Sequence, residues 1–351
     1  MKLLLLIKNL EYGGAFKMFL WVAEALAKKG NDVTIVTYLP NKTREFPNNV
    51  KFLELRLENL GFFGKVKCIR KIIKKQDPEI CLSFLLDANI YNILGCIKTN
   101  VKSVVCERND PYKPHYYKLK LLKPLFAWAD GAVFQLPRTR DYYNNIKVPT
   151  VVIPNPVRES KIRVNKNFNK RDKVVSTLGR IDIFQKRQDV LVNAFVIFHQ
   201  KHPDYVLKIW GDGTEKDEAF LRKQIKQSNA DSYVFLEGVT EKPSESIVST
   251  KFFVLSSDFE GIPNALIEAM TIGLPCISTD CSPGGASLLI EDGVNGVLTP
   301  CGDAELMAEK MCWIVDHPED ADKMGLEARK IVGRFSDEKI STMWNNYLLS
   351  I

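Results

Sequence analysis

The sequence predicts an α/β protein with two doubly wound parallel sheets that face each other across a cleft. Short apolar runs alternate with helical segments along the chain, which is the pattern of parallel strands joined by helices. A polar, basic stretch at 158–173 separates two such series. The 351 residues suffice for two domains with complete cores. We therefore expect domains at 1–157 and 174–335, a linker at 158–173, and a C-terminal helix at 336–351.

Each predicted element rests on hydrophobic periodicity and on its boundary residues. In the first series, strands are expected at 3–7, 33–38, 80–84, 103–106, 132–134 and 150–153, and helices at 15–28, 63–75 and 89–97. In the second series, strands are expected at 174–178, 206–210, 235–239 and 252–257, and helices at 190–198 and 263–270. Pro263 at the first position of the last helix and Gly273 beyond its end are typical boundary residues.

The stretch 260–268 is the most informative segment of the chain. Glu260 follows a predicted buried strand, and Glu268 lies on the first turns of the next helix. Open α/β sheets bind ligands at the carboxyl ends of their strands, where a helix N-terminus offers free N–H groups to a phosphate. A carboxylate can accept hydroxyls of a sugar or a ribose, so the pair indicates a nucleotide-sugar site. The alternative is that both glutamates lie on a solvated surface, as most charged residues do.

Two cations follow the first strand of the second series. Gly179 and Arg180 end the strand, and Lys186 follows six residues later, before a helix. The arginine offers a fork of N–H donors and the lysine a point charge, which is a combination that binds phosphate. Taken alone, both would be ordinary loop cations.

Glycine-rich turns close the next two strands, at Gly211-Asp-Gly213 and Gly238-Val239. With Gly179-Arg180…Lys186 and Glu260-x7-Glu268, this order of motifs resembles the retaining glycosyltransferases of family 4, which have the GT-B fold of two Rossmann-like domains. The resemblance is strongest from about 174 to 300, and Gly13-Gly14 matches the family's glycine loop. The runs 281–285 and 290–296 further resemble members that build bacterial capsule, O-antigen or exopolysaccharide units on undecaprenyl diphosphate.

The resemblance implies an activity and a set of roles. A hexosyl or N-acetylhexosaminyl unit would pass, with retention, from a nucleotide sugar (preferentially a UDP sugar) to a lipid-linked saccharide, by front-face attack in the cleft. The first domain would bind the acceptor, the second the donor, and the helix at 336–351 would pack back on the first domain. Catalytic roles are expected for Arg180 and Lys186, which would neutralise the leaving nucleoside diphosphate, and for Glu260, which would contact the sugar. Glu268 would contact the ribose. Further substrate contacts are expected from Gly13, Gly14, Arg108, Asn109, Gly179, Gly211, Val239, Gly261, Ile262, Asn264, Ala265 and Leu266.

Arg108 departs from the family pattern. Many relatives have a histidine near the sugar after the fourth strand of the first domain, and Arg108 stands at about that place. Arginine cannot act as a base. It would bind a donor or acceptor phosphate, or a sugar hydroxyl; the alternative is a structural ion pair with a neighbouring carboxylate.

No metal and no cofactor is expected. The leaving group's charge would be neutralised by side chains and helix N–H groups, and the histidines at 115, 199, 202 and 317 lack metal-ligand spacing. The eight cysteines contain no Cys-x-x-Cys pair, which favours free thiols in a reducing cytoplasm. The first apolar run lacks the cleavage site of a signal peptide, so we expect it to be a strand. Polar residues interrupt the apolar run at 80–97, which favours a strand followed by a helix over a membrane span.

Charge is divided unevenly along the chain. Residues 1–150 hold 25 Lys and Arg against 13 Asp and Glu, a net charge of +12, whereas the remainder has −5. The basic segments 62–75 and 112–128 mix cations with apolar residues, as in helices that lie on anionic membranes at about 1 kcal/mol per cation. We therefore expect a cytoplasmic protein peripheral on the inner face of the cell membrane. The alternative is that the apolar stripes face the protein core. Nucleic acid is not expected as a partner because no recognition motif accompanies the charge.

Three other classes of protein share some of these features. A nucleotide-sugar epimerase can share the two-sheet architecture, but the paired glutamates and paired cations argue against it. A nicotinamide dehydrogenase would need Gly-x-Gly-x-x-Gly after the first strand, where the chain has only Tyr12-Gly-Gly-Ala15. A non-catalytic sugar-binding scaffold stays open as an alternative, although none of these motifs looks degraded.

Overall fold

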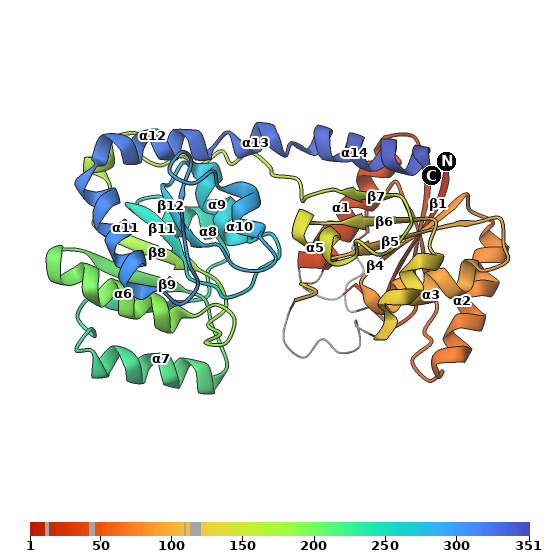
Figure 1. The fold of residues 1–351 in the computed structure, drawn as a ribbon, viewed down its shortest axis with the longest axis horizontal. Coiled ribbons are helices and arrows are strands. Elements are labelled where there is room, and N and C mark those ends of the chain that lie inside the picture. The colour runs from red at the N-terminus through yellow and green to blue at the C-terminus, as the bar shows by residue number, and fades with distance from the viewer. Residues whose placement is uncertain (11–13, 42–45, 109, 113–120) are drawn as a thin grey trace. The chain divides into compact units, whose positions relative to one another are not determined.

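The computed structural model describes residues 1–10, 14–41, 46–108, 110–112 and 121–351. The chain divides into two compact units (Figure 1). Unit 1 comprises residues 1–156 and 337–351, and unit 2 comprises residues 157–336. Each unit is a parallel sheet with helices packed on its two faces, so the prediction of two doubly wound α/β domains is confirmed.

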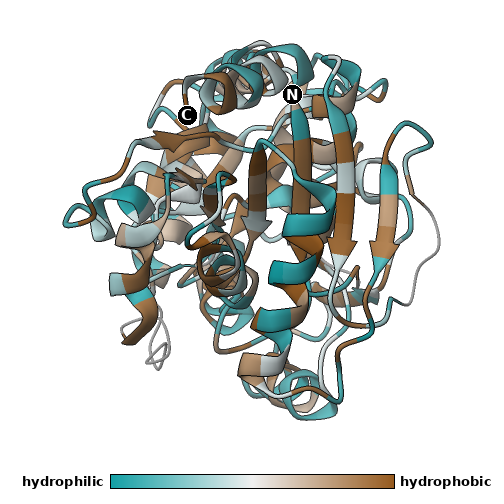
Figure 2. Cartoon of the chain, turned by 90° about the vertical axis from the view of Figure 1, so that its right-hand side faces the viewer, coloured by the Kyte–Doolittle hydropathy of each residue, from teal (hydrophilic) through white to brown (hydrophobic). Residues whose placement is uncertain are grey.

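The sheet of unit 1 is doubly wound. Its described strands run parallel in the order β3-β2-β1-β4-β5-β6-β7, so the chain starts near the centre and fills one side and then the other. The central strands β1 and β4 are mainly hydrophobic (Figure 2) and buried, because helices cover both faces of the sheet. Their bounds are β1 (Lys2–Ile7), β2 (Asp32–Thr37), β3 (Lys51–Glu54), β4 (Ile80–Phe84), β5 (Lys102–Glu107), β6 (Gly131–Phe134) and β7 (Thr150–Val152).

The described helices of unit 1 include one from the far end of the sequence. They are α1 (Gly14–Lys28), α2 (Phe62–Gln76), α3 (Leu86–Cys96), the 3-10 helix η1 (Lys123–Trp128), α5 (Pro137–Tyr142) and α14 (Asp337–Ser350). In α14, Trp344 is fully buried and stacks on Phe84 with ring centroids 5.8 Å apart. The Tyr347 hydroxyl donates to the carbonyl of Pro149 at 2.7 Å. The last helix therefore completes the core of unit 1.

The apolar stripe of α2 faces the protein core. Ile69 and Ile73 are buried, and Val66 and Ile72 pack against the same core cluster. This matches the alternative that the sequence left open for 62–75. Phe63 at the start of the helix remains 84% exposed. Most of the segment 112–128 lies outside the described residues; within its described part, Leu121 and Trp128 are exposed.

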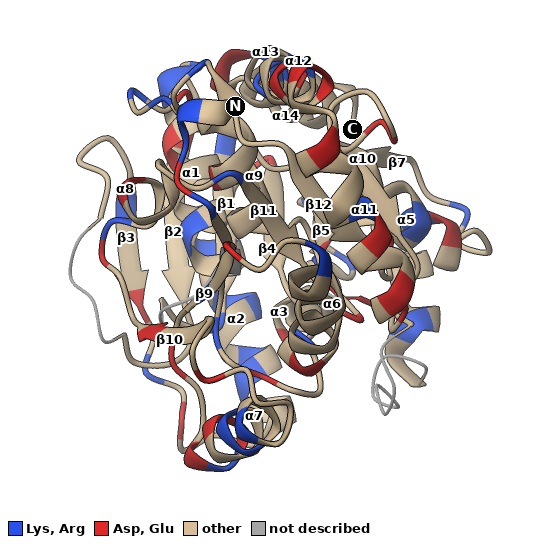
Figure 3. Ribbon diagram, turned by 90° about the vertical axis from the view of Figure 1, so that its left-hand side faces the viewer, with Lys and Arg blue, Asp and Glu red and all other residues tan. Residues whose placement is uncertain are grey.

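Unit 2 repeats the architecture with six strands, in a stretch that is described without gaps. The parallel order is β10-β9-β8-β11-β12-β13. The strands are β8 (Val174–Leu178), β9 (Val206–Trp210), β10 (Val234–Gly238), β11 (Phe252–Leu255), β12 (Cys276–Thr279) and β13 (Val297–Thr299). The helices are η2 (Phe168–Lys170), α6 (Gln188–Lys201), α7 (Glu215–Gln227), α8 (Pro243–Ile247), α9 (Asn264–Ile272), α10 (Gly285–Leu289), α11 (Ala304–Asp316), α12 (Pro318–Ala328) and α13 (Ile331–Arg334). Charged residues cover the outer helix α7, whereas β11 and β12 have none (Figure 3).

The stretch 158–173, expected to be a linker, belongs to unit 2. Phe168 is buried in the core of that unit, and Arg171 pairs with Asp322 at 2.7 Å. The backbone N–H of Val164 also donates to Ile272 at 3.1 Å. The stretch was predicted as a linker because it is mostly polar, and its one aromatic side chain, Phe168, gave no periodic pattern that would indicate burial.

No helix in the described part of the chain is long and apolar enough to cross a bilayer. All eight cysteines are free thiols, and most are buried.

Candidate functional site

The carboxyl edge of the unit 2 sheet is built around close backbone approaches. The N–H of Gly179, just after β8, donates to the carbonyl of Trp210 at the end of β9 at 2.9 Å. A Cβ on Gly211 would lie 2.1 Å from the Gly179 carbonyl oxygen, and the backbone there has a φ of +138°. Only glycine fits this position. The glycine turns therefore bring the ends of β8 and β9 together.

Lys186 and Glu260 form an ion pair at this edge. The Lys186 ammonium donates to Glu260 Oε1, and the side chains are 19% and 9% exposed. The Ser257 hydroxyl donates to the same oxygen at 2.9 Å. The Ser256 hydroxyl donates to the backbone carbonyl of Lys186 at 2.8 Å. An ideal Cβ on Gly179 would lie 3.9 Å from Lys186 Nζ. A cation and a carboxylate predicted separately from two motifs thus meet in one cluster.

The loop that carries Glu260 rests on the run 281–285. The Glu260 N–H donates to the Ser282 carbonyl at 2.8 Å. A Cβ on Gly285 would lie 1.6 Å from the carbonyl oxygen of Gly261, so the two backbones are in direct contact. Burial, and then the Glu260 charge, raise the pKa of the Cys281 thiol to about 12, so the thiol stays protonated at neutral pH. Gly285 is therefore required for the close packing of this run against the Glu260 loop.

The N-terminus of α9 offers unpaired backbone donors. Its N-cap, Pro263, makes no side-chain cap, and the first intrahelical bond is the Ile267 N–H to the Pro263 carbonyl at 3.2 Å. Among the residues that the structure describes, the N–H groups of Asn264, Ala265 and Leu266 have no acceptor. Such a helix terminus is suited to a phosphate.

Glu268 lies one turn further along α9 and is half-buried. The Ser244 hydroxyl of α8 donates to Glu268 Oε2 at 2.5 Å. Its carboxylate keeps capacity to accept further hydroxyl groups. Ser244, Ser256 and Ser257 were not predicted as site residues; an isolated serine gives no signal until its acceptor is known.

Arg180 stands apart from the ion pair. Its side chain is 62% exposed and donates to Asp182 Oδ2 at 2.6 Å. Burial of Asp182 opposes ionisation, but donors from the Gln185 N–H and the Arg180 guanidinium outweigh it and lower the pKa of that carboxyl. If Arg180 and Lys186 are both to bind a phosphate, Arg180 must either break its ion pair with Asp182 or contact Asp182 and the phosphate at the same time.

The other predicted substrate residues fall into three groups. Gly261 and Ile262 lie in the Glu260 loop, and Val239 is 66% exposed after β10. Gly14 opens α1 and Arg108 follows β5, both in unit 1. Gly13 and Asn109 lie outside the described residues.

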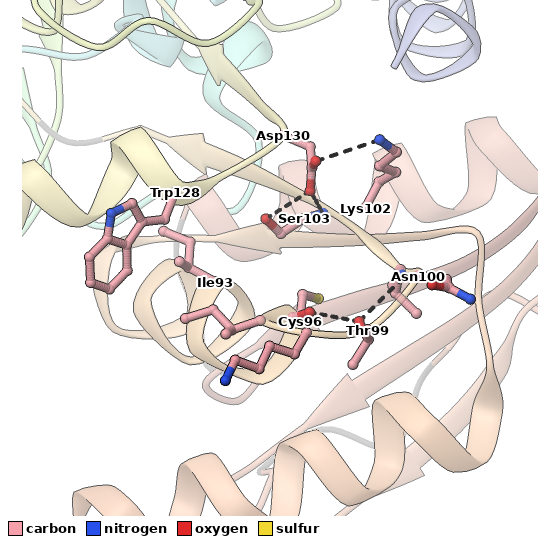
Figure 4. Close-up of a pocket in the computed structure, with 11 residues that line it drawn as sticks. Ile93, Cys96, Thr99, Asn100, Lys102, Ser103, Trp128 and Asp130 are labelled. Atoms are coloured by element: carbon pink, nitrogen blue, oxygen red, sulfur yellow. Dashed lines mark hydrogen bonds and ion pairs between the residues drawn. The ribbon is translucent and has the colours of Figure 1, made fainter.

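A cavity of about 460 Å³ lies elsewhere, at the amino end of β5 in unit 1 (Figure 4). Its lining includes Trp128, Asp130 and the end of α3. Asp130 accepts from the Ser103 N–H at 2.8 Å and pairs with Lys102 at 3.7 Å, so this polar lining is largely satisfied internally. The cavity includes none of the predicted site residues.

No cluster of His, Cys, Asp and Glu side chains suited to hold a metal ion occurs among the described residues.

Comparison with known proteins shows which family the chain is similar to. The model for glycosyl transferases group 1 matches residues 158–331, and that for glycosyltransferase family 4 matches residues 12–161. An uncharacterized glycosyltransferase of Methanocaldococcus jannaschii is 29% identical over 247 residues, which cover 63% of this chain and 60% of the relative.

Two further relatives match over nearly the whole chain. A Campylobacter jejuni alpha-1,4-N-acetyl-D-galactosaminyltransferase, named for a saccharide acceptor on PP-undecaprenol, is 25% identical over 357 residues, covering 98% of this chain and 97% of the relative. The crystal structure of Anabaena HepE in complex with UDP has a TM-score of 0.85 and 18% identity, and the match covers 100% of both chains. Together the two family models cover residues 12–331, and the chain belongs to the glycosyltransferases of the GT-B fold.

Proposed function

We propose that this glycosyltransferase moves a hexosyl or N-acetylhexosaminyl unit, with retention, from a UDP sugar to a saccharide on an undecaprenyl diphosphate carrier in surface polysaccharide synthesis. The observation that carries the proposal is the Lys186–Glu260 pair beside the uncapped N-terminus of α9. This cluster combines a cation and backbone N–H groups for a diphosphate with a carboxylate for sugar hydroxyls. The UDP complex of HepE and the PP-undecaprenol acceptor of the Campylobacter relative support these choices.

The mechanism follows from where negative charge develops. As the bond from the sugar to the diphosphate breaks, charge grows on the leaving nucleoside diphosphate. Lys186 and the N–H groups of Asn264, Ala265 and Leu266 would stabilise it, with Arg180 at the rim. Glu260 would hold a hydroxyl of the transferred sugar, and Glu268 the ribose. In front-face attack, a donor phosphate oxygen takes the proton of the acceptor hydroxyl, so no protein base is required.

Screening of nucleotides by thermal stabilisation tests the donor. We expect UDP and one UDP sugar to raise the melting temperature, because binding at 100 times Kd adds about 2.7 kcal/mol to the unfolding free energy. Glu268→Ala should reduce the stabilisation by UDP and leave that by inorganic pyrophosphate unchanged. Stabilisation by NAD but not by UDP would contradict the assignment. Product analysis with a polyprenyl-diphosphate saccharide then tests transfer, and turnover of the donor sugar without any acceptor would indicate an epimerase.

The cations of α2 are proposed to bind an anionic membrane from the inner face of the cell. Lys71, Lys74 and Lys75 are exposed, whereas the apolar side of the same helix is buried in unit 1. Attraction is therefore expected to be electrostatic, at about 1 kcal/mol per cation near the lipid.

Reversing these three charges to Glu should weaken sedimentation with phosphatidylglycerol-containing vesicles more than tenfold at low salt. The matched control reverses three exposed lysines on α7 of unit 2, namely Lys216, Lys223 and Lys226. Equal sedimentation of the α2 variant and the wild type would remove α2 from the membrane model.

A further inference from the structure

Arg108 is a buried cation at the carboxyl edge of the unit 1 sheet. It follows Glu107, the last residue of β5, and only 9% of it is exposed. The carboxyl edge is where open α/β sheets bind their ligands. The surroundings of this side chain therefore bear on what unit 1 recognises.

The partners of the guanidinium within the described ranges are all neutral. Its Nη2 donates to Asn155 Oδ1, its Nη1 lies 3.7 Å from Cys106 Sγ, and its centre lies 5.6 Å from the ring centroid of Phe84. No carboxylate pairs with this guanidinium anywhere in the described part of the chain. Glu107 accepts a bond from the backbone N–H of Arg108 at 2.9 Å, and strand alternation directs the Glu107 side chain to the opposite face from Cys106 and Arg108. The structural ion pair considered from the sequence is thus not formed.

The site is rigidly built. Phe84, beneath the guanidinium, is fully buried between Phe19 of α1 and Trp344 of α14, with ring centroids 5.2 Å and 5.8 Å away. Asn155 stands between two prolines, at 154 and 156, which restrict its backbone. Burying a cation without a counter-ion is costly, so a fold that holds one in a fixed place favours binding of an anion there.

We propose that Arg108 binds the phosphate of the acceptor, at the junction between the saccharide and its lipid carrier. The inference rests on the proposed function and adds the group that unit 1 recognises. The buried guanidinium keeps N–H groups without an acceptor among the described residues, and such a fork matches phosphate oxygens in a bidentate manner. Unit 2 supplies the donor diphosphate with its own partners, Lys186 and the N-terminus of α9, so the anion left for unit 1 is that of the acceptor. A free phosphate or pyrophosphate ion shares this chemistry, and the experiment separates the two sources.

The test compares two acceptors with the same saccharide, one on an alkyl diphosphate and one on an uncharged alkyl glycoside. We expect wild type to prefer the diphosphate, and Arg108→Gln to lower the ratio of the two kcat/KM values at least tenfold. Arg108→Lys, which keeps the charge but not the fork, should give an intermediate ratio. The matched control is Arg140→Gln, an exposed arginine of α5 paired with Asp141, which should keep the wild-type ratio. An unchanged ratio in a folded Arg108→Gln protein overturns the proposal.

A binding measurement needs no turnover. Inorganic pyrophosphate is titrated into the full-length protein saturated with UDP, so that the donor site is filled. We expect Arg108→Gln to bind at least tenfold more weakly than wild type and Arg140→Gln, and equal titrations would overturn the assignment. Loss of pyrophosphate binding with an unchanged acceptor ratio would make Arg108 a free-anion site and overturn the acceptor assignment. If wild type transfers sugar to neither acceptor, the proposed function fails while the titration still reports on Arg108.

Discussion

Lys186→Ala should lower kcat by tenfold to a hundredfold or more in an assay with the UDP sugar and acceptor. The substitution removes the cation that pairs with Glu260, so the leaving diphosphate loses about 1.4 to 2.7 kcal/mol of transition-state stabilisation. The variant should also be less stable, because Glu260 is buried and would keep the Ser257 hydroxyl as its remaining side-chain donor.

A second variant separates the two effects. Lys186→Gln removes the charge but keeps an N–H donor on a side chain one atom shorter, so its melting temperature should stay closer to wild type than that of Lys186→Ala while kcat still falls. Lys216→Ala on α7, an exposed lysine of the same unit, is the control and should match wild type in both measurements. Wild-type turnover by Lys186→Gln would defeat the phosphate-clamp role.

Gly285→Ala should destabilise the protein by about 3 kcal/mol and lower kcat together with UDP affinity. The added methyl group would lie 1.6 Å from the Gly261 carbonyl oxygen, so the Glu260 loop must move away from the run that supports it. Chemical denaturation and UDP titration measure the two consequences.

Gly333→Ala is the matched control. Nothing lies within 4 Å of a Cβ at that position, which is in the short helix α13. It should leave both stability and UDP binding close to wild type. Unaltered UDP binding by Gly285→Ala would show that the contact between the two loops does not position the site.

Most of the fold is visible in the sequence because burial leaves a strong hydrophobic pattern. The predicted strand at 80–84 coincides with β4, and Gly273 lies just past the end of α9, as predicted. Pro263 was predicted as the first residue of that helix, but it is the N-cap, because its backbone is extended and the helix begins at Asn264. Strand β3 was not predicted because its four residues, Lys51–Glu54, are half-buried or exposed at a sheet edge and lack an apolar run.

The candidate site is visible only as separate motifs. From the sequence, Lys186 was expected to bind the diphosphate and Glu260 the sugar, in separate motifs. The structure shows that the two side chains form one ion pair. Long-range pairing of this kind depends on how β8 and β11 lie side by side in the sheet, which a local pattern does not specify. Arg108 shows the same limit, since a motif does not reveal that its partners are Asn155, Cys106 and Phe84.

Helix α14 has a consequence for how the protein is made. Every residue of unit 2 leaves the ribosome before α14 does, whereas unit 1 is incomplete until residues 337–351 have been synthesised. Until Trp344 emerges, Phe84 lacks the ring that stacks on it. Domains usually mature in order from the N-terminus during synthesis. In this enzyme the order is reversed, and the half translated first is the last to be completed.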